Sequence, residues 1–333
     1  MNEPARAQAF FESPKQFVVK TSCIATRSIR KGTDPVELTV DEIYTALGEN
    51  KIPGGTHAYI EVEGTRKWVA LSCGQYEGEV ATTPPTEEPK DFLPFFDEID
   101  NPIPLRVGGI ADITPVPPQL NKFDRAVVKA CGEPGKRVSR REFVDLMNDN
   151  PEVLEQVKEF VGDRVFANRP SSTSSSDFLQ DLTDAWFSNA EGFNHIFCGE
   201  PVPGGKIGGL HFWGRYLELQ EASLAGRLPG NTSREEVVPG TIYTLGVEMS
   251  VDGGIASSKI KGYGLTLSAE DILKFVTKAF RDNPTRSSRS SACLLDVEDE
   301  GKEFKAVFVR RASGIRTFYP DATPRSNTSQ CQV

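Results

Sequence analysis

Residues 193–213 read FNHIFCGEPVPGGKIGGLHFW and hold His195 and His211, two of the three histidines in this chain of 333 residues. The two histidines are 16 residues apart, and glycines stand close to each of them. Glycine has no side chain, so it lets a backbone come close to another group such as a phosphate. The apolar run FNHIFCG predicts a short strand. Two scarce histidines in one stretch make it the first candidate for a functional site.

The length and composition are those of an ordinary globular protein. At 36.6 kDa the chain exceeds the usual size of a single domain, which predicts two domains. A run of about 18 apolar residues, which a membrane-spanning helix needs, does not occur in the sequence. The N-terminal residues lack the basic and apolar regions of a signal peptide, so we expect a soluble, cytoplasmic protein, with secretion left open.

The six cysteines are scattered and form no Cys-x-x-Cys pair. This spacing favours neither a zinc ribbon nor a dense disulfide framework. The sequence therefore predicts buried free thiols at Cys23, Cys73, Cys131, Cys198, Cys293 and Cys331.

The net charge of −9 argues against a general nucleic-acid coat, because such binding depends on Lys and Arg at phosphates. The acidity is uneven: residues 178–333 hold 17 basic and 19 acidic residues, and the rest of the chain holds 21 and 28. A site for a polyanion therefore remains compatible with the C-terminal half.

Two changes in composition divide the chain. Residues 81–104 are rich in proline and acidic residues and predict a linker, and the serine-rich residues 170–176 predict a surface loop. The predicted organisation is a β-rich N-terminal module over 1–80, the linker over 81–104, a helical extension over 105–177 and a C-terminal domain over 178–333.

The N-terminal module has strand patterns at 58–62 and 67–71, joined by a Glu63-Gly64 turn. Its order of short strands resembles bacterial SH3-like barrels, with Leu38–Tyr44 and Trp68-Val69 as the matching pieces.

Helices and strands are expected in the rest of the chain. Apolar spacing, capping residues and an N-terminal proline predict helices over 118–130, from Ser139 onward, over 151–162 and over 177–187. The C-terminal part mixes strands with a single helix from Ser268 to Phe280 and a hairpin around Glu300-Gly301. Since strands and helices do not alternate strictly, the pattern indicates an α+β fold.

A pair of histidines suits cleavage of RNA by its own 2′-OH. That reaction needs a base for the hydroxyl proton, an acid for the departing 5′-oxygen and stabilisation of charge on the phosphate. Histidine can fill either proton-transfer role near neutral pH. Two other interpretations are open: His195 and His211 are structural, or they bind zinc together with Cys198 in a His-x2-Cys-x12-His pattern, as in a zinc-dependent hydrolase.

The segment also resembles the central signature of the EndoU endoribonucleases, which include viral uridylate-specific enzymes and animal poly-U-cleaving nucleases. In that family the first His is followed five residues later by an acidic residue after Gly, and the second follows a Gly-Leu or Gly-Phe pair. Two further pieces resemble the family in the same order, Lys259 within Ser257-Ser258-Lys259 and the C-terminal sequence Thr317-Phe318-Tyr319-Pro320. The matching residues of the signature are His195, Gly199, Glu200, Gly209, Leu210 and His211.

The resemblance implies a role for each matching residue. His211 would be the general base, His195 the general acid and Lys259 the cation that stabilises the phosphate, with Lys261 as an alternative to Lys259. Tyr319 would stack on the base 5′ of the scissile bond, and Thr317 would help to select uracil.

As a whole, the resemblance implies an EndoU-like domain of two small β-rich lobes with helices over 178–333. It implies cleavage of single-stranded RNA 3′ of uridines, leaving a 2′,3′-cyclic phosphate, with no metal in the chemistry and stimulation by Mn²⁺ or Ca²⁺ left open. A protein that binds RNA without cleaving it is the alternative. The chain departs from many relatives at Asn194, where they have Glu, and at Phe212-Trp213, where they have Asn-Trp.

Overall fold

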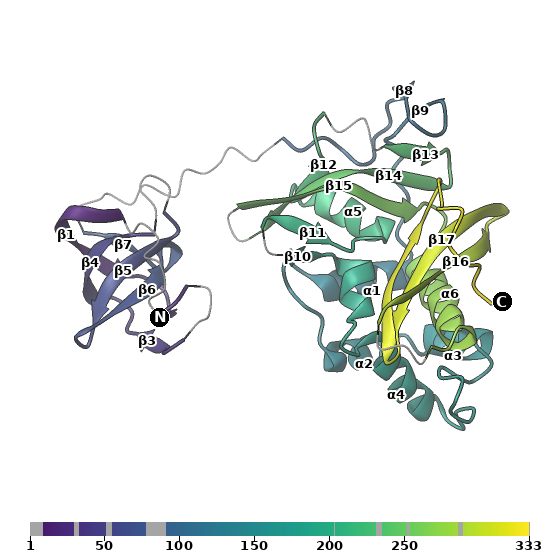
Figure 1. Cartoon of the computed structure of the whole chain (residues 1–333), viewed down its shortest axis with the longest axis horizontal. Helices are drawn as coiled ribbons and strands as arrows, with labels where there is room; N and C mark the ends of the chain where they lie inside the picture. Colours follow the sequence, from purple (N-terminus) through teal and green to yellow (C-terminus); the bar gives the residue numbers. More distant parts are fainter. Residues whose placement is uncertain are drawn as a thin grey trace. The chain divides into compact units, whose positions relative to one another are not determined.

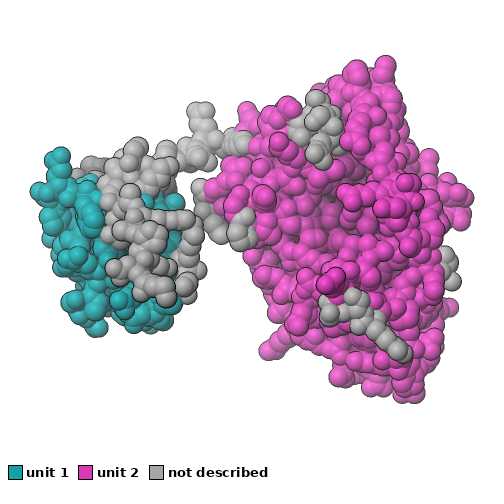
Figure 2. All heavy atoms as spheres, in the orientation of Figure 1, with its two compact units in different colours: residues 1–89 teal, residues 90–333 magenta. Residues whose placement is uncertain are grey.

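The computed structural model divides the chain into two compact units, Met1–Pro89 and Lys90–Val333 (Figures 1 and 2). It describes residues 9–29, 33–50, 55–77, 91–202, 204–230, 235–251, 254–285 and 289–332. The first unit is rich in strands and the second combines sheets with helices, which confirms the α+β prediction.

Unit 1 is built on one antiparallel sheet in the order β6-β5-β4-β1-β7, with a separate β2-β3 pair. Alternate residues of the sheet, among them Phe17, Ala46, Ile60 and Val69, point inward and form a core of their own. The resemblance to SH3-like barrels stays a prediction. The elements are β1 (Ala9–Val19), β2 (Cys23–Ala25), β3 (Val36–Leu38), β4 (Ile43–Glu49), β5 (His57–Val62), β6 (Thr65–Ala70), η1 (Leu71–Cys73) and β7 (Gly74–Tyr76).

The helical part of unit 2 begins where the sequence indicates helix starts. Asn121, Ser139 and Ser174 are N-caps whose side chains accept from the first-turn backbone, and Pro151 opens the third helix. The four helices are α1 (Lys122–Cys131), α2 (Arg140–Asn148), α3 (Pro151–Phe160) and α4 (Ser175–Trp186).

Two larger sheets, the β8-β9 pair, the short helix η2 and the helices α5 and α6 complete the described part of unit 2. The larger sheet has the order β10-β11-β15-β14-β12, with β13 paired to β14, and the smaller one has the order β16-β17-β18. In Figure 1, α2, α3 and α4 lie at one end of the unit and the sheet of β14 and β15 at the other. The elements are β8 (Ile103–Pro104), β9 (Ile110–Ala111), η2 (Asn194–Cys198), β10 (Glu200–Val202), β11 (Lys206–Gly208), α5 (Trp213–Glu221), β12 (Ala225–Arg227), β13 (Glu236–Val238), β14 (Ile242–Val251), β15 (Gly254–Gly264), α6 (Ala269–Asp282), β16 (Ser291–Asp299), β17 (Lys302–Arg311) and β18 (Gly314–Pro320).

One hydrophobic core joins the helices to the sheets. Phe143 of α2, Trp186 of α4, Phe197 of η2 and Ile272 of α6 all belong to it. The helices over the expected extension 105–177 therefore fold together with the C-terminal strands in a single unit.

Part of the expected linker over 81–104 also packs on unit 2. Phe95 and Phe96 are fully buried, and the side chain of Gln220 in α5 accepts from both of their backbone N–H groups. Residues 91–104 are thus anchored to the unit by two apolar side chains in a proline-rich context, while residues 81–90 lie outside the described residues.

The prediction of free thiols is wrong. All six cysteines are paired, as Cys23–Cys73 in unit 1 and as Cys131–Cys198 and Cys293–Cys331 in unit 2. The partners lie 38 to 67 residues apart in sequence, so no local spacing indicates the pairing. Among the described residues, no helix is long and apolar enough to cross a membrane.

Candidate active site

The segment that carries His195 is a short π-helix, η2, and the expected strand over FNHIFCG is wrong. The N–H of His195 donates to the carbonyl of Glu191, and the N–H of Gly199 donates to the carbonyl of Asn194. Most of the segment's side chains are buried, and a short apolar run of this kind fits a buried helix as well as a strand. π-Helical turns are rare and often occur at functional sites.

Asn194 fixes this helix to the loop before α2. Its buried side chain accepts from the N–H of Val138 and donates to the carbonyl of the same residue, at 2.8 and 3.0 Å. Asparagine can make both bonds because its amide has one acceptor and one donor group, which the Glu of many relatives does not offer.

Gly209 explains why a glycine stands near the second histidine. A Cβ atom at this position would lie 1.7 Å from the carbonyl oxygen of His195, and φ is +63°. The close approach lets Leu210 N–H donate to the carbonyl of His195 and His211 N–H to that of Ile196, each at 2.8 Å. The two histidines, 16 residues apart in sequence, are thereby tied together through their backbones.

A disulfide lies directly beside the site. Cys198, the last residue of η2, is bonded to Cys131 at the end of α1. A disulfide sulfur is not the thiolate that binds zinc, so the set His195, Cys198 and His211 does not form and the zinc hypothesis is wrong.

Replacing Cys131 and Cys198 by serine together is expected to destabilise unit 2. The bond closes a loop over a separation of 67 residues, which the chain-entropy model values at about 4 kcal/mol. For a unit of this size that corresponds to a Tm lowered by roughly 10 °C. Thermal unfolding of the variant measures it, with the Cys23→Ser and Cys73→Ser pair in unit 1 as control. An unchanged Tm for unit 2 contradicts the expectation.

His211 is buried, and its ring is held in one tautomer. Nδ1 lies 3.0 Å from the carbonyl oxygen of Gly262, which only accepts, so Nδ1 carries the proton and Nε2 keeps its lone pair. Burial holds the pKa of His211 well below its ordinary value, and the positive charges of Lys261 and His195 lower it further. His211 is therefore neutral near pH 7, as a general base must be.

His195 is prepared for the opposite role. Its Nδ1 lies 2.9 Å from Oε2 of Glu200, to which it donates, so the Nε2 position is free to gain and lose a proton. Burial lowers the pKa of His195 below its ordinary value, and the hydrogen bond to Glu200 offsets part of this shift. The ring centroids of His195 and His211 are 5.9 Å apart. Sequence reasoning left Glu200 outside the site, although its position five residues after His195 was part of the resemblance.

Lys261 lies close enough to both histidines for its charge to affect them. Its charge lowers the pKa of His195 and of His211, and burial lowers its own pKa to about 8. Lys259, the expected residue, is exposed on the same strand.

An irregularity in β15 separates the two lysines. The pairing with β14 shifts between Leu245, which faces Lys261, and Val247, which faces Ser258, so β15 has one extra residue here. Such a bulge redirects side chains. In a regular strand, residues two positions apart point to the same face. This rule does not hold across the bulge, so Lys259 and Lys261 need not share a face.

Thr317 and Tyr319 come from β18, which lies against η2 and β15. The Tyr319 ring stacks on His211 at a centroid distance of 5.3 Å. Thr317 is buried, and its Oγ1 has no hydrogen-bond partner within the described part of the chain. The structure thus brings His195, His211 and Tyr319 together, with Glu200 bonded to His195, and Thr317 lies two residues before Tyr319 on β18.

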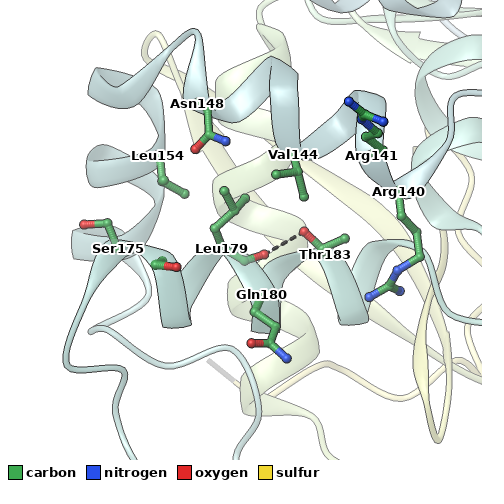
Figure 3. A pocket seen from close by; sticks show the side chains of 10 residues that line it. Arg140, Arg141, Val144, Asn148, Leu154, Ser175, Leu179, Gln180 and Thr183 are labelled. Atoms are coloured by element: carbon green, nitrogen blue, oxygen red, sulfur yellow. Dashed lines mark hydrogen bonds between the residues drawn. The ribbon is translucent and has the colours of Figure 1, made fainter.

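A pocket of about 530 Å³ lies elsewhere, between α2, α3 and α4. Figure 3 shows Val144, Leu154 and Leu179 toward its apolar part and Arg140 and Arg141 at one side. Arg140 is paired with Asp184, and the lining includes none of the residues around the two histidines.

Comparison with known proteins finds one family. Residues 189–322 match the family model for the bacterial EndoU nuclease. The matched range begins just before η2 and ends just after β18, so it contains both histidines, Glu200, Lys259, Lys261, Thr317 and Tyr319. Among curated proteins, no similar sequence is found.

Proposed function

Because residues 189–322 belong to the EndoU nuclease family, we propose that this nuclease is an endoribonuclease that cleaves single-stranded RNA 3′ of uridines. The observation that supports this most directly is the pair of imidazoles, 5.9 Å apart, whose Nδ1 positions are both occupied. Each ring therefore has its Nε2 position available for proton transfer.

In the proposed reaction, Nε2 of His211 takes the proton of the ribose 2′-OH. The 2′-oxygen then forms a bond to phosphorus, the bond from phosphorus to the 5′-oxygen breaks, and Nε2–H of His195 protonates the departing oxygen. The products are a 2′,3′-cyclic phosphate and a 5′-hydroxyl. His211 ends protonated and His195 neutral, and exchange with water restores both.

The environments of the two rings fit this division of roles. Burial and neighbouring cations hold the pKa of His211 well below its ordinary value. Burial also lowers the pKa of His195, but there the hydrogen bond and the charge of Glu200 oppose the shift. Two titratable groups whose surroundings differ in this way are typical of an acid–base pair. Lys261, as a compact cation beside both rings, would stabilise the charge that develops on the phosphate.

Uridine selection is proposed for β18. Tyr319 stands beside His211, where an aromatic ring can stack on the base attached to the reacting ribose. Stacking accepts any base, so selection needs a polar contact. Thr317 Oγ1 is a buried polar atom without a partner among the described residues, two positions before Tyr319 on the same strand.

Replacing Thr317 by valine is expected to lower the preference for uridine over cytidine by about 10-fold, the value of one hydrogen bond. Valine keeps the volume and removes the hydroxyl, and serine at the same position keeps the hydroxyl as the control. Cleavage rates on RNAs that differ only in one U or C measure the ratio. An unchanged ratio in the valine variant removes Thr317 from the proposal.

No step of the proposed reaction is assigned to a metal, since His211, His195 and Lys261 already supply base, acid and cation. Stimulation by Mn²⁺ or Ca²⁺ would then act on the RNA or on the fold. Cleavage in EDTA, compared with cleavage after addition of each ion, distinguishes these effects from a chemical role.

The experiment that tests the function uses a short labelled RNA with one uridine and its 2′-deoxyuridine twin. Cleavage of the first to a cyclic phosphate, and none of the second, supports the 2′-OH mechanism. Binding of the RNA without cleavage would instead identify a silent RNA-binding protein.

The disulfides bear on the compartment. Such bonds form and persist in oxidising surroundings and are rare in the cytosol. Three of them use all six cysteines, so we propose an oxidising compartment as the place of action, in contrast to the cytoplasmic expectation. Thiol labelling of the protein from its native source, followed by mass spectrometry, tests this.

A further inference from the structure

Glu200, which accepts a hydrogen bond from the ring of His195, is itself paired with Arg316 of β18. Nη2 of Arg316 lies 3.3 Å from the same carboxylate oxygen, Oε2, that accepts from His195. The Glu200 side chain is 13% exposed and that of Arg316 is 28% exposed, so neither group is fully in solvent.

Arg316 is fixed at a second point. Its Nη1 donates to the carbonyl of Ala190 at 2.9 Å, four residues before Asn194 opens η2. A guanidinium can serve both acceptors at once because its donors form a rigid planar fork. Arg316 also directly precedes Thr317 in β18. Arg316 therefore links three parts of the site: the segment that leads into η2, the carboxylate of Glu200 and β18, the strand proposed to recognise the base.

We propose that Arg316 is a positioning residue that acts on the acid His195 through Glu200 and couples it to β18. The inference deepens the proposed function and rests on it for the role of His195. The contacts themselves are independent of whether RNA is the substrate.

The charges around Glu200 determine what the loss of Arg316 does. Arg137, from the loop before α2, lies 3.5 Å from Oε1 of Glu200 and is also paired with Glu191, and Lys261 acts on the carboxylate from β15. Burial raises the pKa of Glu200, but His195 and Arg316 outweigh it, so the carboxyl stays ionised. With Arg137 and Lys261 still present, Glu200 is expected to stay ionised without Arg316.

Arg316 and Glu200 change the pKa of His195 in opposite directions. Arg316 lowers the pKa of His195 by repulsion, and Glu200 raises it by hydrogen bonding and attraction. Arg316→Gln should therefore move the titration of His195 to higher pH, and Glu200→Gln should move it to lower pH. A residue that only supports the fold would not produce this opposed pair.

Nuclear magnetic resonance can follow the titration of His195 directly, because the chain has only three histidines. His57 lies in unit 1 and serves as an internal reference. Arg311→Gln is the matched control. Arg311 donates to the carbonyl of Asn189 at 3.2 Å, next to the carbonyl that Arg316 uses, and within the described part of the chain it forms no ion pair with Glu200. We expect His195 to titrate in Arg311→Gln as in the unaltered protein.

RNA cleavage gives the second readout. Arg316→Gln should lower kcat by about 10-fold through misplacement of the acid, with KM less affected, and Arg316→Lys should restore part of the loss. An unchanged His195 titration in folded Arg316→Gln, or an equal shift in Arg311→Gln, overturns the proposal. If the titrations shift as expected but the unaltered protein cleaves no RNA, the coupling stands and the proposed function fails.

Discussion

Replacing His211 by alanine is expected to lower kcat/KM for a uridine-containing RNA by about 10²–10⁴-fold, the usual contribution of a general base or acid. The reason lies in how the ring is prepared. The Gly262 carbonyl fixes the tautomer, and burial keeps the ring neutral, so Nε2 can accept the 2′-OH proton over a wide pH range. A water molecule that replaced the missing ring would be a weaker base and would not be held in this orientation.

His57→Ala is the matched control, because it removes a histidine of unit 1 that lies outside the nuclease-family match. It should leave cleavage unchanged. The double variant His195→Ala and His211→Ala adds a second check, since the two residues would act in the same proposed reaction and their losses should then not multiply. His211→Ala with more than half of the original activity, in a protein of unchanged Tm, would remove this residue from the chemistry.

The elements with local signals are the ones that the sequence predicts well. The Ser139 and Glu142 capping box and the Ser268 cap both open helices in the structure, because each cap satisfies N–H groups within its own first turn. The hairpin of β16 and β17 turns at Glu300-Gly301 for a similar local reason, since both residues have positive φ.

The elements that the sequence does not predict depend on distant partners. The helix η2 is anchored by Asn194 to Val138, 56 residues away, and the apolar run alone fits either structure. The disulfide partners are likewise distant, so their pairing follows from the fold.

The candidate site divides in the same way. Motifs in the sequence indicate His195, His211 and Tyr319, and their rings lie together in the structure. The roles of Glu200 and Arg316 become visible only once β18 packs against η2, because the residues are 116 apart in sequence. The choice between the two lysines depends on a bulge, which a pattern of strand residues does not reveal.

That choice carries the second large prediction. Lys261→Ala is expected to lower kcat by about 10²–10³-fold, the effect of removing one group that stabilises the transition-state charge, and Lys259→Ala should cost much less. The contrast follows from position, since Lys261 is partly buried and acts on both histidines, whereas Lys259 is exposed. Equal losses in the two variants would contradict the assignment.

The pH dependence of cleavage tests whether the positive charge of Lys261, and not only the size of its side chain, contributes to the reaction. Burial lowers the pKa of Lys261 to about 8, so the cation is present below that pH and is lost as pH rises through it. The acid His195 loses its proton at lower pH, so log kcat/KM should fall with a slope of about −1 first and about −2 above pH 8. Lys261→Arg keeps its charge throughout and should keep the slope near −1. A slope of −2 in the arginine variant would mean that some other group, and not this lysine, titrates near pH 8, and the pH profile would then give no support to the role of Lys261.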